Sequence, residues 1–255
     1  MARYQVILTY DGSQYQGFQR QRQAETIQGV VENALCEIGW KGQSILAAGR
    51  TDSGVHAIGQ VIAFDLDWNH SARELQAAIN SLLPPAIAAL SAEEVNETFH
   101  PRFDATSRSY RYHVFSQSTR FPLRERFAWR VWPAVDLDKM TQAADSLIGR
   151  QNFAAFGSPP RAGGSTWRTV FQASWRLIPG IWEIPDLVLE IRADAFLYRM
   201  VRRLVYILVA IGQGKLEPGV IARNLDTPPV EMLQGLAPPN GLVLVSVSYN
   251  DGDLL

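Results

Sequence analysis

The stretch "AAGRTDSGVHAIGQV", residues Ala47–Val61, combines a turn with two opposite charges. Arg50 and Asp52 stand two positions apart among three glycines, between segments whose apolar patterns predict β-strands. Glycines permit backbone dihedrals that other residues avoid, and they let a ligand approach the chain closely. Two interpretations follow: a hairpin turn closed by an ion pair between Arg50 and Asp52, or a loop that presents one carboxylate for chemistry.

The segments on both sides of this loop predict alternating strands and helices. Alternating apolar residues indicate strands, and apolar residues three and four apart behind a capping Thr, Ser or Asp indicate helices. On this basis strands are expected at 4–12, 44–48, 59–67, 87–95, 107–116, 167–178, 187–195 and 241–249, and helices at 26–39, 71–85, 136–149 and 196–214. The order strand, helix, strand, strand, helix, strand occurs twice.

This repeated order predicts an α+β fold of two pseudo-symmetric halves, with a largely antiparallel mixed sheet flanked by helices. The N-terminal half is expected at 1–103 and carries the loop with Asp52. The C-terminal half is expected at 104–255 and carries a tyrosine-containing strand and an arginine-containing helix.

The composition is that of a globular protein. The chain has 255 residues, of which 47% are hydrophobic, which suffices for a well-buried core. Its longest apolar stretch, Leu204–Gly212, is shorter than the about 20 residues that a membrane span needs. The single cysteine, Cys36, excludes an intramolecular disulfide and a multi-thiolate metal site. The first residues lack the plan of a signal peptide, so a cytoplasmic protein with no membrane association is expected.

The basic residues are unevenly distributed, although the net charge is only −1. Between Phe99 and Arg130 seven arginines face two acidic residues. Arginine suits bidentate phosphate contacts better than lysine does, so this clustering is compatible with an RNA-binding face. Ordinary solvated surface charge is the alternative.

Several familiar catalytic motifs are missing. No glycine-rich nucleotide-binding loop is present, and the four histidines have no close pair that would indicate a metal site. Asp52, Ser53 and His56 are the residue types of a hydrolase triad, but residues this close on a tight loop seldom reach triad geometry. Asp52 therefore stands as the candidate, because an ionised carboxylate can act as a nucleophile or as a base.

Two further segments offer partners for this carboxylate. In the strand "SRSYRYHVF", Arg108, Tyr110 and Tyr112 share one face. A tyrosine there offers a flat surface to a base and a phenol for proton exchange, although a strand tyrosine is also an ordinary core residue. In "FLYRMVRRL", Arg202 is surrounded by apolar residues and would need a carboxylate partner if buried, for which we nominate Asp52. An arginine in water is the alternative.

Taken together, five segments resemble one known family. "YDGSQYQGFQRQ…TIQGVVENAL", "AGRTDSGVHAIGQV", "FHPRFDATSRSYRYHVF", "DAFLYRMVRRLV" and "APPNGLVLVSVSY" are similar, in order and spacing, to the TruA-type tRNA pseudouridine synthases. The similarity extends from about Tyr4 to Tyr249. It implies the pseudouridine synthase fold and a cofactor-free, metal-free isomerase. Such an enzyme converts uridine to pseudouridine in the anticodon stem-loop of tRNA, at positions 38, 39 and 40, usually as a homodimer.

The resemblance also implies roles for individual residues. Asp52 matches the catalytic aspartate, Arg50 its neighbouring arginine, and Arg202 the arginine that pairs with the aspartate. Tyr110 matches the tyrosine that contacts the target base, while Tyr112 shares its face. An apolar residue under the uracil matches Leu244, with Leu242 as an alternative register. Phosphate contacts are expected from the arginines of the polar loop and of the tyrosine strand, namely Arg20, Arg22, Arg108 and Arg111.

The chemistry implied by the resemblance fits these residue types. Pseudouridine formation breaks a C–N glycosidic bond, rotates the uracil and forms a C–C bond. Asp52 supplies a carboxylate for attack on the sugar or on the base, and Tyr110 with Leu244 supplies walls for the detached ring. Either Tyr110 or Asp52 can remove the ring proton. The first alternative is a non-catalytic RNA-binding module. A glycosidase is a weaker alternative, because no second acid is recognisable.

Overall fold

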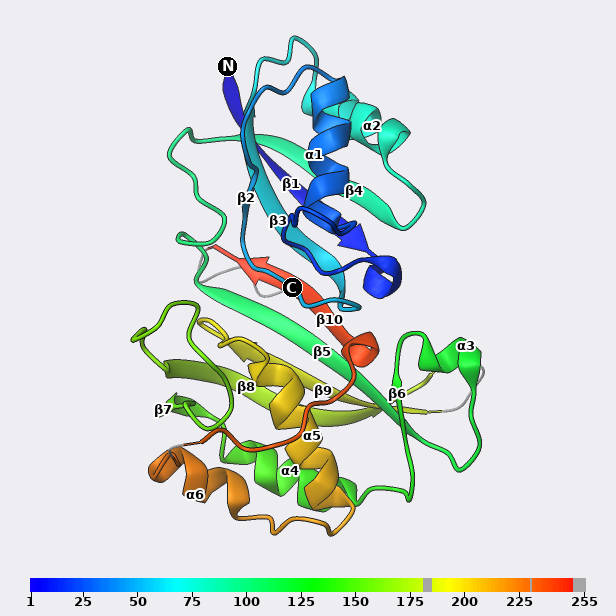
Figure 1. Ribbon diagram of the computed structural model, residues 1–255, viewed down its shortest axis with the longest axis vertical. Coiled ribbons are helices and arrows are strands. Elements are labelled where there is room, and N and C mark those ends of the chain that lie inside the picture. The colour runs from blue at the N-terminus through cyan, green and yellow to red at the C-terminus, as the bar shows by residue number, and fades with distance from the viewer. Residues whose placement is uncertain (181–184, 230, 250–255) are drawn as a thin grey trace. The chain divides into compact units, whose positions relative to one another are not determined.

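The computed structural model describes residues 1–180, 185–229 and 231–249 (Figure 1). Their contacts divide the chain into two compact units. The first contains Met1–Thr106 together with the chain from Val243 onward, and the second contains Ser107–Leu242. The boundary near residue 106 lies close to the expected boundary between 103 and 104. The last strand is grouped with the first unit from Val243 onward, and its backbone pairs with a strand of that unit.

The sheet of the first unit is built around two long strands. Strands β1 (Ala2–Tyr10) and β3 (His56–Leu66) pair antiparallel, and β4 (Ile87–Val95) pairs antiparallel with the other edge of β1. The short strand β2 (Leu46–Ala47) pairs antiparallel with β3. Strand β10 (Leu242–Ser248) runs parallel to β3, with Val243 opposite His56 and Leu244 opposite Ala57. These pairings place the start of β3, directly after the Asp52 loop, between β1 and β10.

Two capped helices complete this unit. Helix α1 (Ile27–Glu37) begins behind Thr26, whose hydroxyl oxygen accepts a hydrogen bond from the Gly29 amide. Helix α2 (Ala72–Leu82) begins with a capping box between Ser71 and Glu74, and it packs against β4. A short 3-10 turn (Gly12–Gln14) follows β1. Each predicted cap satisfies amide donors that a helix start otherwise leaves unpaired.

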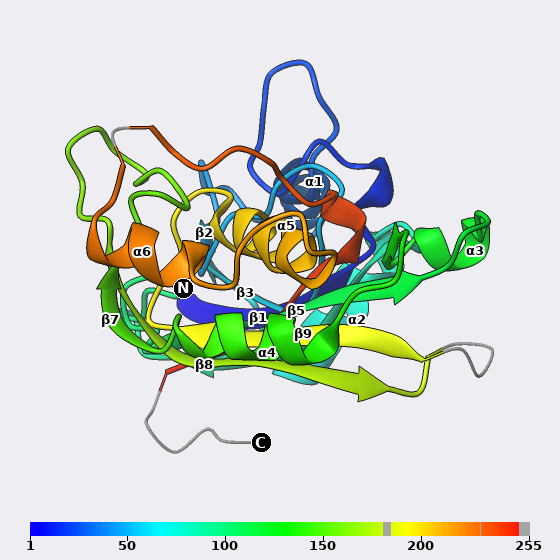
Figure 2. The same ribbon diagram turned by 90° about the horizontal axis from the view of Figure 1, so that it is seen from below.

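Five strands of the second unit pair with one another. Strands β5 (Ser107–Ser116), β9 (Asp186–Ala193), β8 (Trp167–Ile178) and β7 (Gly149–Asn152) follow one another in antiparallel pairs, and β6 (Trp129–Val131) runs parallel to β5. Figures 1 and 2 show helix α5 (Met200–Gly212) across one face of β8 and β9. Helix α4 (Leu137–Asp145), capped by Asp136, packs against α5 and β8. Further helical segments among the described residues are α3 (Pro122–Glu125), α6 (Val220–Asp226) and the 3-10 turn Pro239–Gly241.

The predicted helix over 196–214 is wrong at its start. The helix begins at Met200, because Arg199 adopts a left-handed conformation with φ 62° and ψ 9°. Just before it, the Tyr198 amide donates to the carbonyl of Ser158, which holds the chain in a bridge outside the helix. Tyr198, which the predicted helix would place on the same face as Arg202, therefore lies outside the helix.

The predicted fold class is confirmed: the sheet pairing is mixed and mostly antiparallel, and helices flank it. No helix among the described residues is both long and apolar enough to span a membrane.

One ion pair of the first unit predicts a pH-dependent stability. Arg3 binds the Asp65 carboxylate through two hydrogen bonds of 2.8 and 2.9 Å, and the bond from Arg3 lowers the pKa of Asp65. A carboxylate with a lowered folded-state pKa stabilises the protein above its unfolded pKa, and this contribution is lost as the pH falls. We expect wild type to melt above the Asp65→Asn variant at pH 7. The difference should shrink below about pH 4. Melting curves between pH 7 and 3 check this, and a constant difference would contradict it.

Candidate active site

The loop that carries Asp52 is fixed at both of its ends. The Ala48 amide donates to the Val61 carbonyl at 2.9 Å, and the Gln60 side chain donates to the Gly49 carbonyl at 2.9 Å. A tight turn follows, in which the Val55 amide donates to the Asp52 carbonyl at 3.1 Å. Gly54 in this turn has φ 78°, a conformation that disfavours residues with a Cβ. The glycines of the motif thus serve to close the turn directly behind Asp52.

A second loop, residues 15–20, braces the same turn from outside. The Phe18 amide donates to the Thr51 carbonyl at 3.0 Å, and the Ser53 hydroxyl donates to the Tyr15 carbonyl at 3.1 Å. Thr51 is buried, and its hydroxyl shares a 2.8 Å hydrogen bond with the phenol of Tyr10. The residues on both sides of Asp52 are therefore held by partners outside the turn, while Asp52 itself is half-buried.

The Arg50 side chain is exposed. Backbone and side-chain hydrogen bonds to residues 15, 18, 60 and 61 hold the turn. The interpretation of the motif as a hairpin closed by a pair of Arg50 and Asp52 stays a prediction. Arg50 keeps its exposed position two residues from the carboxylate.

Burial separates the two tyrosines that share a face of β5. Tyr112 is fully buried, its hydroxyl donates to the Pro238 carbonyl at 2.7 Å, and burial raises its pKa well above the ordinary value. Tyr110 is half-buried and meets the ring of Phe196 edge to face at 5.1 Å between centroids. Tyr112 is a core residue, so Tyr110 is the tyrosine with surface to offer a ligand.

Arg202 lies in the first turn of α5 in the second unit. Its Nε donates to the Ala237 carbonyl at 2.8 Å, and the Ala237 amide donates back to the Arg202 carbonyl at 3.1 Å. The next residue, Arg203, donates to the Phe156 carbonyl, and burial lowers its pKa. These contacts give the half-buried Arg202 a defined orientation within its unit.

The apolar candidates of β10 are both in the core. Leu244 is fully buried and Leu242 is 6% exposed, so burial does not decide between them.

The four arginines expected to bind phosphate differ in their surroundings. Arg20 forms a 2.6 Å ion pair with Glu32, and Arg111 forms a 2.8 Å ion pair with Glu190. Arg108 donates to the Asp194 carbonyl at 2.8 Å, and Arg22 is exposed. Two of the four arginines, Arg20 and Arg111, are thus already paired with carboxylates of the fold, which could not be known from residue type alone.

Comparison with known proteins identifies the family. A family model described as tRNA pseudouridine synthase matches residues 6–104 and 143–250. The chain is 35% identical to a tRNA pseudouridine synthase A of an Exiguobacterium species, over 99% of this chain and all of the relative. It is 39% identical to that of Geobacter sulfurreducens, over 98% of this chain and all of the relative. The chain belongs to the tRNA pseudouridine synthase family.

Membership in the synthase family confirms the resemblance on the five segments, together with the pseudouridine synthase fold and the enzyme class, an isomerase. Asp52 and Arg202 lie inside the matched ranges, whereas Tyr110 lies between them. A solved structure of a Cbf5–Nop10–Gar1 complex is similar over 81% of this chain and 45% of that chain, with 12% identity and a TM-score of 0.37, a likeness too weak to carry a conclusion. Within the described ranges no three His, Cys, Asp or Glu side chains are grouped to hold a metal ion.

Proposed function

We propose that this chain isomerises uridine to pseudouridine in the anticodon stem-loop of tRNA, at positions 38, 39 and 40. The observation that carries the proposal is the braced turn around Asp52, found in a chain that belongs to the tRNA pseudouridine synthase family. A carboxylate that must attack or deprotonate a reactant gains rate from being held in one place. Hydrogen bonds on both sides of Asp52 support that role.

In the proposed reaction Asp52 is the catalytic carboxylate. The C–N glycosidic bond breaks, the detached uracil rotates, and a C–C bond forms to the same sugar. The ring carbon that joins the sugar then loses its proton, and the ring nitrogen that left the sugar carries one. Product and substrate are isomers, so no second substrate is consumed. Asp52 attacks either the sugar or the base, and the proton leaves to Asp52 or to the Tyr110 phenol.

The other candidate residues receive supporting roles. Tyr110 is proposed to contact the target base, Leu244 to lie under the uracil, and Arg202, with Arg50 nearby in the sequence, to keep the Asp52 carboxylate ionised. The half-buried position of Tyr110 supports its role, whereas the sequence alone did not distinguish it from Tyr112. Reaching the base requires flipping it from the stem, at a cost of a few kcal/mol.

The partner is proposed to be tRNA, bound by a cytoplasmic homodimer through its anticodon arm. Arg22 and Arg108 are the better candidates for phosphate contacts. Arg20 and Arg111 are also proposed, but each would have to share its charge with a carboxylate of the fold.

The test of the proposed function is conversion of unmodified tRNA transcripts. A panel with uridine at one of positions 38, 39 and 40, and matched transcripts with cytidine there, is incubated with the protein, and pseudouridine is mapped at nucleotide resolution. We expect conversion of the first set only. Binding without conversion anywhere in the panel would favour the non-catalytic RNA-binding module and would refute the proposal.

The two tyrosines of β5 offer a matched pair of variants. Tyr110→Phe is expected to lower kcat about 100-fold with tRNA binding retained, because the ring remains and the phenol is lost. Tyr112→Phe is expected to keep kcat and to lower the free energy of unfolding by about 1–2 kcal/mol, because the buried Pro238 carbonyl loses its donor. Single-turnover kinetics and urea unfolding of both variants check this. The reverse assignment of effects would show that Tyr112 is the functional residue.

A further inference from the structure

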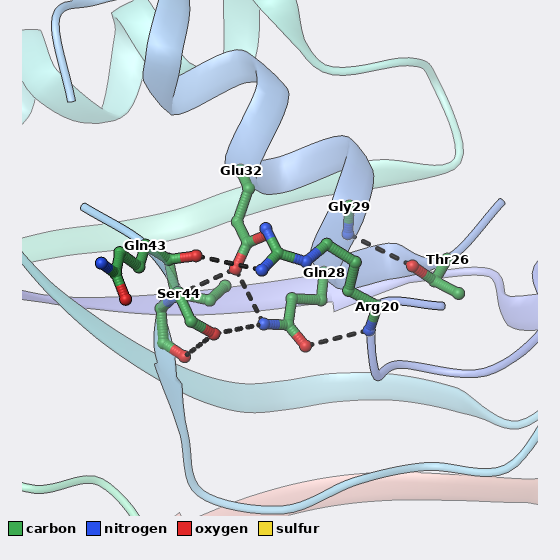
Figure 3. Close-up of polar contacts among 8 residues, drawn as sticks. Arg20, Thr26, Gln28, Gly29, Glu32, Gln43 and Ser44 are labelled. Atoms are coloured by element: carbon green, nitrogen blue, oxygen red, sulfur yellow. Dashed lines mark hydrogen bonds and ion pairs between the residues drawn. The ribbon is translucent and has the colours of Figure 1, made fainter. Parts of the chain in front are cut away.

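A buried carboxylate lies at the centre of a polar network in the first unit, shown in Figure 3. Glu32 of α1 is only 3% exposed. Its side chain accepts hydrogen bonds from the guanidinium of Arg20 at 2.6 Å, from the amide of Gln28 at 2.7 Å and from the backbone amide of Ile45 at 3.1 Å. All three partners are N–H donors, so the carboxylate is the common acceptor of the network.

Gln28, one turn earlier on α1, extends the network. Its side-chain oxygen accepts from the Arg20 backbone amide at 3.0 Å, and its nitrogen also donates to the Ser44 hydroxyl at 2.8 Å. Arg20 further donates to the Gln43 carbonyl at 3.0 Å. The two helix side chains therefore connect α1 to the loop 15–20 on one side and to residues 43–45 on the other.

Both connected segments lead to the Asp52 turn. In the loop 15–20, the backbone amide of Phe18 donates to the Thr51 carbonyl, and the Phe18 carbonyl accepts a hydrogen bond from the backbone amide of Gln28 at 2.9 Å. Residues 43–45 run into β2, which continues into the loop that carries Asp52. Glu32 thus contacts both segments that lead to the turn.

The burial of the Glu32 carboxylate is energetically unfavourable and calls for an explanation. Removing an ion from water costs several kcal/mol, and an apolar side chain in its place is often neutral or stabilising. The charge at Glu32 is balanced by Arg20 and by two further donors. What an apolar residue could not do is fix the direction of the loop 15–20 relative to α1 and β2, because apolar contacts are non-directional.

We propose that Glu32, together with Gln28, is a positioning residue for Asp52, acting through Arg20 and the loop 15–20. This inference rests on the proposed function. It assigns the Arg20 guanidinium to holding the loop against the helix, in place of the phosphate contact considered above.

The test is Glu32→Gln, assayed as the full-length protein under single-turnover conditions on a convertible tRNA. Whichever way the new amide is turned, its NH₂ group faces an N–H donor, so the network cannot be rebuilt. We expect kcat to fall about tenfold with KM for tRNA within about twofold, because the carboxylate of Asp52 is misplaced while the RNA-binding surface is unchanged. Asp65→Asn, which breaks an ion pair of the same unit away from this network, is the matched control and should keep kcat.

Arg20→Ala keeps the inference testable if Glu32→Gln does not fold. A positioning role predicts a lower kcat, an unchanged KM and an unchanged salt dependence of tRNA binding. A phosphate contact predicts a higher KM and a salt slope shallower by about one, with kcat retained. The second result would overturn the inference, as would wild-type kcat in Glu32→Gln. A wild type that binds tRNA without converting it would instead refute the proposed function, and the inference with it.

Discussion

Asp52→Asn is expected to abolish pseudouridine formation while leaving tRNA binding intact. The amide has nearly the shape of the carboxylate and can keep its place in the turn, but it is neither a useful nucleophile nor a base. We expect kcat to fall about 10⁴-fold or more, as for other catalytic groups removed without disturbing their surroundings. Binding is expected to change little, because phosphate contacts supply most of the affinity for a nucleic acid.

Single-turnover conversion and filter binding of the same tRNA transcript measure the two effects separately. Asp67→Asn serves as the control, since this acidic residue of the same unit is largely exposed and directly follows the end of β3 that is distant from the turn. It should match wild type in both assays. If Asp52→Asn converts tRNA at a rate within tenfold of the control, Asp52 is not the catalytic carboxylate and the turn has to be interpreted as a binding element.

Gly17→Ala is expected to have the next largest effect. Gly17 has φ +86°, and a Cβ placed there would lie 2.9 Å from the Thr51 oxygen and 3.3 Å from the carbonyl carbon of Asp52. These are backbone atoms that cannot rotate away, so the Asp52 turn itself must move. A displacement of this kind costs rate even where the chemistry is untouched, and we expect kcat to fall about 100-fold.

Gly39→Ala provides the control for Gly17→Ala. Gly39 also has a positive φ, +96°, but a Cβ there would meet nothing within 4 Å. Both variants should therefore lose about 1–2 kcal/mol of stability through the left-handed backbone, and only Gly17→Ala should lose activity. Urea unfolding and single-turnover rates below the melting transition separate the effects. Equal rates in the two variants would show that residues 15–20 do not control the position of Asp52.

The sequence predicted those elements whose pattern is local. The strands at 107–116 and 167–178 agree with β5 and β8 to the residue, because long alternating segments bury one face. The caps at Thr26 and Asp136 were also predicted, since a side-chain oxygen in front of a helical pattern has a local function. The short strands β6 and β7 were missed because three or four residues are too few to show a period.

The sequence predictions that failed concern features set by contacts between residues far apart in the sequence. The start of α5 is set by the left-handed backbone of Arg199 and the bridge to Ser158, neither of which leaves a trace in the local pattern. Likewise, Arg20 could be recognised as a basic loop residue, but its pairing with Glu32 is visible only once the loop is folded against α1. For the same reason the period-two pattern could not separate Tyr110 from Tyr112, whereas burial does.

The parallel pairing of β10 with the start of β3 has a consequence for biosynthesis. The strand that completes the first unit leaves the ribosome only after residues 107–242, which separate it from the rest of that unit. Until Val243 and Leu244 emerge, the backbone groups of β3 that they pair with lack this partner, although residues 107–242 have already been synthesised. The two units are therefore completed in the reverse of the order in which their synthesis begins. The unit whose translation starts first is completed second, and a message truncated before codon 243 yields no complete copy of it.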